Sequence, residues 1–185
     1  MTRLTVLGIA LAFIAYVGCA EPMNPNDSAD SHVTCIGTYD SRAIAVAFVG
    51  SKVYKDTAGK ELADMLQEYK KAEAEGDTKR VEELKTWGES QQALLHRQGF
   101  STAPVDNVLE YISEQLPKIM NRTGVELLVS KWDAKTLAKY QSAERVDVTM
   151  RLVEAFKPND KQKKIAIEIQ KYDPVPLEKM EGHNF

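Results

Sequence analysis

The chain has 185 residues, a length typical of one domain, and carries 24 lysines and arginines against 27 aspartates and glutamates. The formal net charge is −3, and the basic residues alternate with acidic ones instead of gathering in one segment. A nucleic-acid-binding protein normally shows a basic patch, so this distribution argues against nucleic acid as a partner.

The first twenty residues have the pattern of an export signal. Arg3 supplies the positive start, Leu4 to Val17 is an uncharged apolar run, and small residues follow it. The apolar run is shorter than the ~20 residues that a membrane-spanning helix needs. We therefore predict that residues 1–20 are a signal peptide and that the protein works in the periplasm or cell envelope.

Two processing routes remain open at the end of this signal. Cleavage before Cys19 would give a lipoprotein whose N-terminal cysteine carries the lipid, so Cys19 is a candidate lipidation site. The lipid would then be the only contact of the protein with the membrane. Cleavage after Ala20 would release a soluble protein. Residues 21–32, rich in Pro, Asn, Asp and Ser, are predicted to form a disordered tether. Either route leaves Cys35 as the single thiol, which we expect to be a small buried apolar residue.

The start of the folded part is predicted to be a strand followed by a helix. Val33 to Tyr39 has the composition of a β-strand, and Arg42 to Val49 is almost wholly apolar. Asp40 or Ser41 is well placed to cap this helix. A helix that is apolar on most sides is expected to lie inside the core.

The middle of the chain, about residues 57–99, is charged, free of proline and helical in its apolar spacing. The pattern is interrupted at Gly76, a good residue for a helix end, and Asp77, a good residue for a helix start. We predict two helices that form a projecting antiparallel hairpin. The alternative is one continuous helix bent at Gly76.

The second half mixes helices with short strands. The predicted elements are a helix over Val105 to Thr123 kinked at Pro117 and ended by Gly124, a strand over Val125 to Ser130, a third strand near Arg145 to Val146, a helix starting at Asp147 or Thr149, a helix over Lys161 to Tyr172, and an extended tail over residues 173–185. Alternating isoleucines would also suit a strand over Lys161 to Tyr172. The predicted fold class is therefore α+β, mostly α, with a small β-sheet core and a projecting hairpin, in one domain over residues 33–172.

Four segments, in this order, resemble the Skp/OmpH-like family of periplasmic chaperones. They are Ile36 to Arg42, the hairpin of residues 57–99, Gly124 to Val129, and Val146 to Thr149 followed by Leu152-Val153. The resemblance covers about Val33 to Phe156. The chain departs from the family in its shorter hairpin, its acidic charge and a C-terminal extension.

The resemblance implies a non-enzymatic holdase, a trimer whose helical prongs hold unfolded outer-membrane proteins. Scattered apolar side chains on a charged prong would suit weak binding of many clients. The candidate client-binding residues on the hairpin are Leu66, Tyr69, Val81, Leu84, Trp87 and Leu95. The other interpretation of these residues is that they hold the two helices together.

An enzyme is the rival class, and the sequence offers few parts for one. His32, His96 and His183 are far apart, and no metal-binding, Cys-x-x-Cys or phosphate-loop motif is present. Asp40 and Asp147 are better explained as helix caps than as paired carboxylates. We predict no catalytic residues, no cofactor and no metal.

A third class is a structural or interaction lipoprotein of the envelope that binds one specific partner. It could use the hairpin, or a C-terminal arm formed by the residues from about Ile165 to Leu177, whose proline pair favours an extended backbone. The alternative for this segment is a strap that lies on its own domain.

Overall fold

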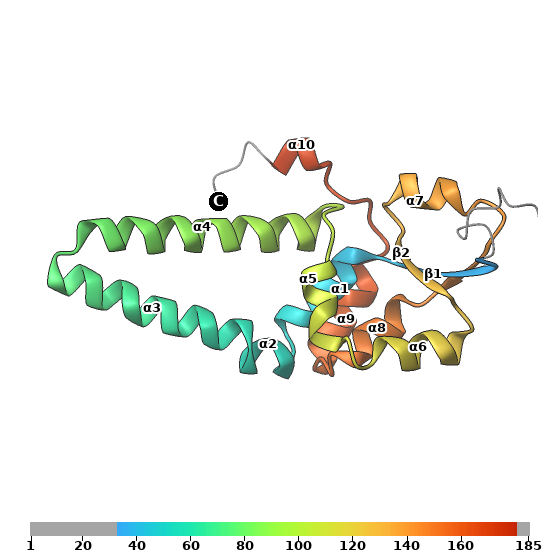
Figure 1. Ribbon diagram of the computed structural model, residues 1–185, viewed down its shortest axis with the longest axis horizontal. Coiled ribbons are helices and arrows are strands. Elements are labelled where there is room, and N and C mark those ends of the chain that lie inside the picture. The colour runs from blue at the N-terminus through green and yellow to red at the C-terminus, as the bar shows by residue number, and fades with distance from the viewer. Residues whose placement is uncertain (1–32, 181–185) are drawn as a thin grey trace, which may run out of the picture. The chain divides into compact units, whose positions relative to one another are not determined.

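A computed structural model describes residues 33–180 of the chain. The predicted signal peptide, the tether, Cys19 and the end of the predicted tail lie outside these residues. The elements are β1 (Cys35–Tyr39), α1 (Ser41–Val49), α2 (Lys52–Asp56), α3 (Ala58–Glu75), α4 (Thr78–Phe100), α5 (Asp106–Leu109), a short 3-10 helix (Glu110–Ile112), α6 (Leu116–Thr123), β2 (Leu127–Ser130), α7 (Ala134–Lys139), β3 (Glu144–Asp147), α8 (Thr149–Ala155), α9 (Asp160–Ile169) and α10 (Leu177–Met180) (Figure 1). The prediction of a mostly helical chain with a small sheet is confirmed.

The sheet has three parallel strands in the order β2-β1-β3. In the central strand, Ile36 pairs with Leu127 on one side and with Arg145 on the other. Parallel strands need long crossover connections, and the chain supplies them as helices. Both faces of such a sheet must be covered, which explains the apolar character of β1 and β2.

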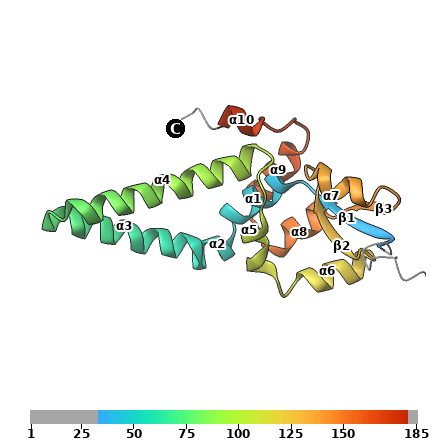
Figure 2. The ribbon, with the colours of Figure 1, turned by 45° about the horizontal axis from the view of Figure 1, so that its top comes forward.

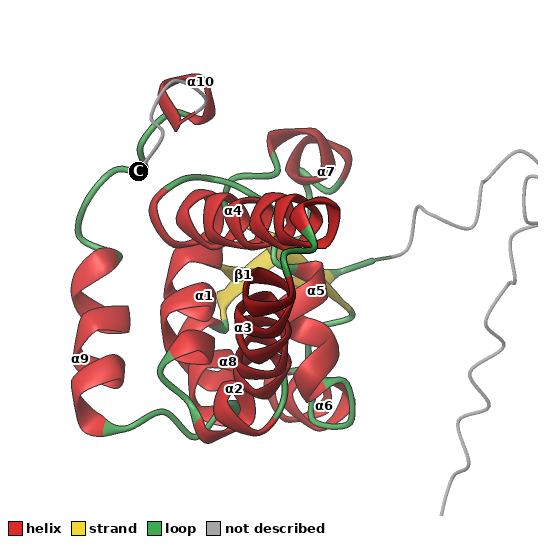
Figure 3. Ribbon diagram, turned by 90° about the vertical axis from the view of Figure 1, so that its left-hand side faces the viewer, coloured by secondary structure: helices red, strands yellow, loops and turns green. Residues whose placement is uncertain are grey.

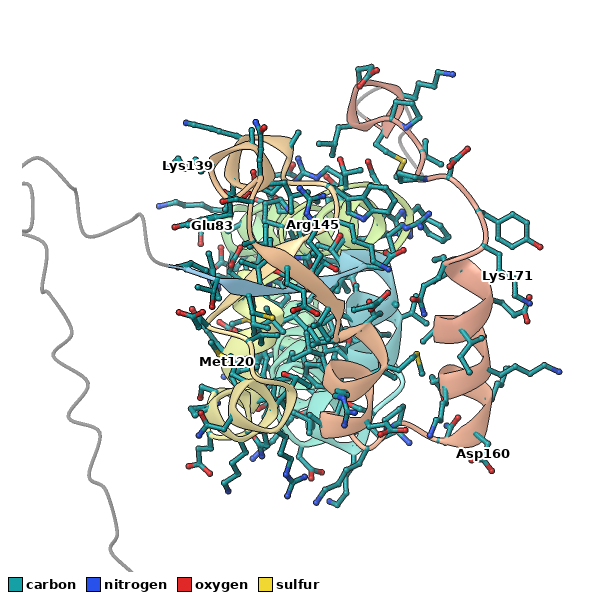
Figure 4. All side chains as sticks on the ribbon, turned by 90° about the vertical axis from the view of Figure 1, so that its right-hand side faces the viewer. Glu83, Met120, Lys139, Arg145, Asp160 and Lys171 are labelled. Atoms are coloured by element: carbon teal, nitrogen blue, oxygen red, sulfur yellow. The ribbon has the colours of Figure 1, made fainter. Side chains whose placement is uncertain are left out.

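Helices cover the two faces of the sheet separately. The larger core lies on the face covered by α1, α5 and α8, and it includes Ile44, Phe48, Leu152 and Phe156. The smaller core lies on the other face, where Ile36 and Val129 meet side chains from the region of α7. Figure 4 shows these layers, with Lys139 of α7 and Met120 of α6 on opposite sides of the strands.

Glycine is required where β1 faces the larger core. A Cβ atom on Gly37 would lie 2.9 Å from Leu128 Cδ2 and 3.0 Å from Val125 Cγ2. Contacts this short would force the neighbouring side chains to move. Gly37 therefore lets the residues around β2 approach the central strand.

Side-chain caps start several helices where the sequence predicts them. Asp40 accepts a hydrogen bond from the Arg42 main-chain N–H at the start of α1, and Asp77 accepts one from the Arg80 N–H at the start of α4. Asp147 accepts from the Thr149 N–H, although α8 itself has no side-chain cap at Val148. These caps satisfy N–H groups that the first helical turn leaves unpaired.

The predicted helix over Val105 to Thr123 is wrong. The chain divides it into α5, the 3-10 helix and α6, and Pro117 lies in the first turn of α6. Proline has no N–H to donate and is tolerated in the first turn but not in a helix interior. Pro117 therefore starts a new helix instead of kinking a long one, and Gly124 ends it in the left-handed conformation, as predicted.

Three helices were not predicted, namely α2, α7 and α10. The four residues of α10 correct the prediction that the whole tail from residue 173 is extended. The segment with alternating isoleucines is helical, as α9, so the strand alternative for it is wrong. Helix α9 packs along α1.

Glu126 fastens the start of β1 beside β2. Its Oε1 atom accepts hydrogen bonds from the Thr34 hydroxyl at 2.7 Å, the Thr34 N–H at 2.9 Å and the Cys35 N–H at 3.2 Å. The hydrogen bonds from the Thr34 hydroxyl and N–H lower the pKa of Glu126 below its ordinary value of 4.5. Their effect is larger than the opposite effect of burial, which raises the pKa. A carboxylate that accepts several hydrogen bonds is favoured in its charged form.

This lowered pKa predicts a contribution to acid sensitivity. Because the folded state favours the charged form, the stabilisation is present above pH 4.5 and is lost as the pH falls through the folded-state pKa. We expect Glu126→Gln to unfold at a lower urea midpoint at pH 7 but to lose less of that midpoint between pH 7 and pH 3 than the wild type. The control is Glu73→Gln, at an exposed position on α3, and equal losses in Glu126→Gln and wild type would contradict the prediction.

Candidate functional site

The most extended feature among the described residues is the pair α3 and α4, which we call the arm. The two helices meet at Gly76, whose φ of 74° is left-handed, and diverge toward the core (Figures 1 and 2). Glycine adopts this conformation without the cost that a side chain brings. The alternative of one continuous helix bent at Gly76 is therefore wrong.

An ion pair joins the two helices of the arm near its end. Arg80 of α4 binds Glu68 of α3 at 2.8 Å and also Glu83 at 2.9 Å. Ala72 and Leu84 are the buried apolar residues of the two helices. The partners of Arg80 are exposed, so these ion pairs contribute little to stability.

The six candidate client-binding residues do not share one surface. Leu84 is 6% exposed and lies inside the arm, whereas Leu66 is 53% exposed. Tyr69, Val81, Trp87 and Leu95 are half-buried. Trp87 and Leu95 line a small cavity of about 100 Å³ that also touches Phe48 of α1. Leu84 thus agrees with the other interpretation, in which these residues hold the two helices together. Leu66 is the candidate with the most accessible side chain.

An open apolar pocket lies where the arm joins the core. Its volume is about 800 Å³, within the range of ligand-binding clefts. It is lined from α1, α3, α4 and α9 by Ala45, Val46, Val49, Gly50, Leu62, Gly88, Gln91, Gln92, Leu95, His96, Gly99, Phe100, Gln162 and Ile165. Figure 3, which looks along the arm, shows α4, α1 and α9 around this side of the core.

Large apolar side chains at the pocket stay accessible. Val49, Leu62, Phe100 and Ile165 all line it, and their exposed fractions are 42%, 43%, 55% and 41%. Gathered apolar groups on a surface mark an interaction site more often than scattered ones do. Of the six candidate client-binding residues, only Leu95 lines this pocket. The available signal was the helical spacing of Gly88, Gln91, Leu95 and Gly99 along one face of α4.

The polar groups of the pocket are uncharged amides, together with His96. The Oε1 atom of Gln162 is buried and has no hydrogen-bond partner. Its side chain lies against Gly50, where a Cβ atom would come within 1.8 Å of Gln162 Cγ. Gly50 therefore leaves the space that the Gln162 side chain occupies.

The C-terminal segment is attached beside this pocket. The Val175 N–H donates to the Phe100 carbonyl at 2.9 Å, and the Ser101 hydroxyl donates to the Val175 carbonyl at 2.5 Å. These bonds hold the segment on its own domain. The strap interpretation therefore agrees with the structure better than a free docking arm.

Asp40 and Asp147 do not form a carboxylate pair. Both oxygens of Asp40 accept hydrogen bonds from Arg42, and Oδ2 lies 2.7 Å from Nη2. Asp40 and Arg42 are each 2% exposed. Asp147 binds Lys131 at 2.6 Å and the Thr149 N–H. Burial would raise the pKa of Asp147, but the hydrogen bonds from Lys131 and Thr149 outweigh it and lower that pKa.

The remaining sequence candidates are dispersed. His32 and His183 lie outside the described residues, and His96 packs edge-on against Phe100 in the pocket wall, with ring centres 5.9 Å apart. Cys35 is half-buried against the larger core, and burial, followed by Glu144 and Glu126, raises the pKa of its thiol. Between residues 33 and 180, no group of three or more His, Cys, Asp or Glu side chains is placed to hold a metal ion.

Over the same described range, no helix combines the length and the apolar character needed to cross a membrane. Comparisons of the chain with protein-family models, with curated proteins and with solved structures found no match. The functional assignment therefore starts from the geometry of the arm and of the pocket at its base.

Proposed function

We propose that this protein is an exported chaperone-like protein that holds unfolded envelope proteins, outer-membrane proteins among them, without catalysis. In this proposal the arm is a projecting antiparallel hairpin that contacts the client, as the resemblance to the Skp/OmpH-like family implies. Residues 1–20 direct export, and Cys19 is the position for a lipid anchor if the protein is a lipoprotein.

The observation that carries this proposal is an exposed apolar strip on the charged helix α3. Leu62 and Leu66, four residues apart, lie on the same side of the helix and are 43% and 53% exposed. Leu62 also lines the pocket at the base of the arm, so the strip continues into it. Apolar contacts of this kind do not depend on client sequence, which suits the holding of many unfolded chains.

A homo-oligomer, a trimer by the resemblance, accompanies this proposal. Its support is the small sheet, which ends in two edge strands, β2 and β3. Edge strands present unpaired main-chain groups, and a neighbouring subunit could cover them.

The second candidate function is an envelope lipoprotein that binds one defined partner. The concave pocket favours it, because a shaped cavity selects a particular segment more strongly than a flat strip does. In this alternative the partner would be bound at the base of the arm, because the C-terminal segment is already fastened to Phe100 and Ser101.

Leu66→Asp tests the holdase function. We expect the variant to bind an unfolded outer-membrane barrel protein roughly tenfold more weakly, because a charge replaces an apolar contact worth more than 1 kcal/mol. The measurement is light scattering of the barrel protein diluted from urea with increasing amounts of the secreted protein. The same instrument reports the oligomeric mass before and after the client is added.

The matched control is Gln67→Asp, which adds the same charge at the next exposed position of α3. Gln67→Asp should suppress aggregation as the wild type does. Failure of the wild type to suppress aggregation at any ratio would contradict the holdase and leave the single-partner alternative.

A further inference from the structure

Another cavity, of about 260 Å³, is lined by α6 and α8, and we call it the basic cleft. It shares no residue with the pocket at the base of the arm. Figures 1 and 2 show both helices at the end of the core away from the tip of the arm. The volume is below the range of clefts that enclose a whole drug-sized ligand, so the basic cleft suits a small ligand or one group of a larger one.

Three cations line the basic cleft. Lys118 and Arg122 are four residues apart, so they lie on the same side of α6. Arg151 comes from α8, which packs against α6. Ile119 and Ala155, one on each side of the cleft, are half-buried apolar residues and offer no counter-charge. The packing of the two helices therefore brings three positive side chains to one concave site.

The carboxylate that lines the basic cleft, Glu154, is already bound to another cation. Its Oε1 atom accepts a hydrogen bond from Lys163 Nζ at 2.7 Å. This hydrogen bond, with a smaller contribution from the charge of Arg151, lowers the pKa of Glu154 below its ordinary value of 4.5. Between residues 33 and 180, Lys118, Arg122 and Arg151 form no ion pair. Lys163 neutralises Glu154, and the three other cations keep an uncompensated charge.

This arrangement is unfavourable without an anion. Like charges four residues apart on a helix repel each other, and Lys118 and Arg122 are such a pair. An anion in the cleft would remove the repulsion and accept hydrogen bonds from both helices. The chain as a whole has a formal net charge of −3, so its surface does not attract anions in general. Binding of an anion would therefore depend on this cleft.

The number and type of the donors select the class of anion. A guanidinium group can donate two parallel hydrogen bonds to phosphate or carboxylate oxygens, and a lysine adds a compact positive charge. A phosphate monoester carries nearly two negative charges at neutral pH and three acceptor oxygens. A carboxylate carries one charge on two oxygens. Two guanidinium groups and one ammonium group at separate positions therefore match a phosphate group best.

We infer that the basic cleft binds the phosphate group of a phosphate monoester, held by Lys118, Arg122 and Arg151. The inference goes beyond the proposed function and does not rest on it, because no residue of the arm lines the cleft. A free phosphate ester and a lipid headgroup present the same chemistry. The experiments below distinguish these two sources.

The first test is isothermal titration calorimetry of methyl phosphate into the protein at pH 7 and fixed ionic strength. Arg122→Gln should weaken binding by about tenfold, because it removes a charged hydrogen-bond donor. The matched control is Arg145→Gln, which removes the same charge from an exposed position on β3 that does not line the cleft. Both side chains are exposed, so both variants should fold. Equal losses in the two variants would overturn the inference.

The second test changes the charge of the ligand. A phosphate monoester loses its second proton with a pKa of about 6, whereas methyl sulfate keeps one charge throughout. The charged groups of the cleft and beside it are Lys118, Arg122, Arg151, Glu154 and Lys163, and no histidine lines it. Lysine and arginine ordinarily titrate well above neutral pH, and the pKa of Glu154 is lowered, so the ligand is the group that titrates between pH 5 and pH 7.

The affinity for methyl phosphate should therefore rise by about fivefold from pH 5 to pH 7, while that for methyl sulfate stays constant. Parallel changes for the two ligands would contradict recognition of a doubly charged phosphate group. Malonate, which has two charges on carboxylate oxygens, should bind more weakly than methyl phosphate at pH 7. If malonate binds equally well or better, the assignment to phosphate is wrong.

Vesicles identify the source of the phosphate group. If the protein binds methyl phosphate but does not float with phosphatidylcholine vesicles that contain phosphatidic acid, the inference holds for a free ester. If it floats with these vesicles and Arg122→Gln releases it, the inference holds for a lipid headgroup. Failure to bind both methyl phosphate and the vesicles would overturn it.

The proposed function and this inference fail separately. Leu66→Asp, which tests the holdase, should bind methyl phosphate as the wild type does, because Leu66 is not part of the cleft. Loss of methyl phosphate binding in Leu66→Asp would overturn the location of the site. Methyl phosphate binding by a protein that does not suppress aggregation would retain the basic cleft and reject the holdase.

Discussion

Replacing Asp40 with alanine should lower the free energy of unfolding by about 3–5 kcal/mol, which would unfold many proteins of this size. Asp40 and Arg42 are both 2% exposed, and the carboxylate accepts from Nε at 3.1 Å and from Nη2 at 2.7 Å. Removal of the carboxylate leaves the guanidinium buried without its counter-charge, and Trp132 beneath it, with its ring centre 5.0 Å from Cζ, cannot replace an anion. The cap of α1 is lost as well.

Chemical denaturation with urea measures this change, and two further variants identify its cause. Asp56→Ala breaks an ion pair with Lys52 in which both partners are exposed, so its cost should be about 1 kcal/mol or less. The double variant Asp40→Ala/Arg42→Met removes both charges and should recover part of the loss, since an apolar replacement leaves no unpaired charge. A double variant less stable than Asp40→Ala alone would contradict this explanation.

Phe156→Ala should cost a similar amount, about 3–5 kcal/mol, for a different reason. Phe156 has 0% exposure at the end of α8, and its ring lies 5.7 Å from that of Phe48 in α1. Phe48 in turn touches Tyr54 next to the arm and stacks on Tyr111 at 4.8 Å. The deletion therefore leaves a cavity in the cluster of rings that connects α8 with the base of the arm.

The matched control is Phe100→Ala, which removes the same side chain where it is 55% exposed. The free energy of unfolding, obtained from the urea transition, should fall by about 1 kcal/mol or less, because more than half of this side chain is already exposed to water. If Phe156→Ala and Phe100→Ala were equally stable, the ring cluster would not be the centre of the core.

Several features could be read from local patterns because their cause is local. Asp40, Asp77 and Gly76 determine where helices begin and end through their own hydrogen bonds and backbone preferences. The apolar run after Asp40 likewise predicts the buried helix α1. The segment around Pro117 shows the limit, since a proline within a helical pattern is compatible with a kink or with a new start, and the packing of α6 against α8 selects the second.

The candidate site was harder to predict because it is assembled from distant segments. Leu84 and Leu66 carry the same side chain on the arm, but only the contact between α3 and α4 makes one buried and the other exposed. The pocket joins residues from four helices, and the Gln162 side chain fits beside Gly50 only because that position lacks a Cβ atom. The apolar periodicity of one helix does not indicate which distant segments line a pocket with it.

By itself, the sequence determined the helix ends at Gly76 and Gly124, the caps at Asp40 and Asp77, and the mostly helical α+β class, because these depend on interactions over a few residues. Tertiary structure decided the parallel order β2-β1-β3, the packing of α9 along α1, and the pocket at the base of the arm. These features depend on which surfaces are buried together. Which surfaces pack together is decided by the free energy of the whole chain, and the pattern of one segment does not determine it.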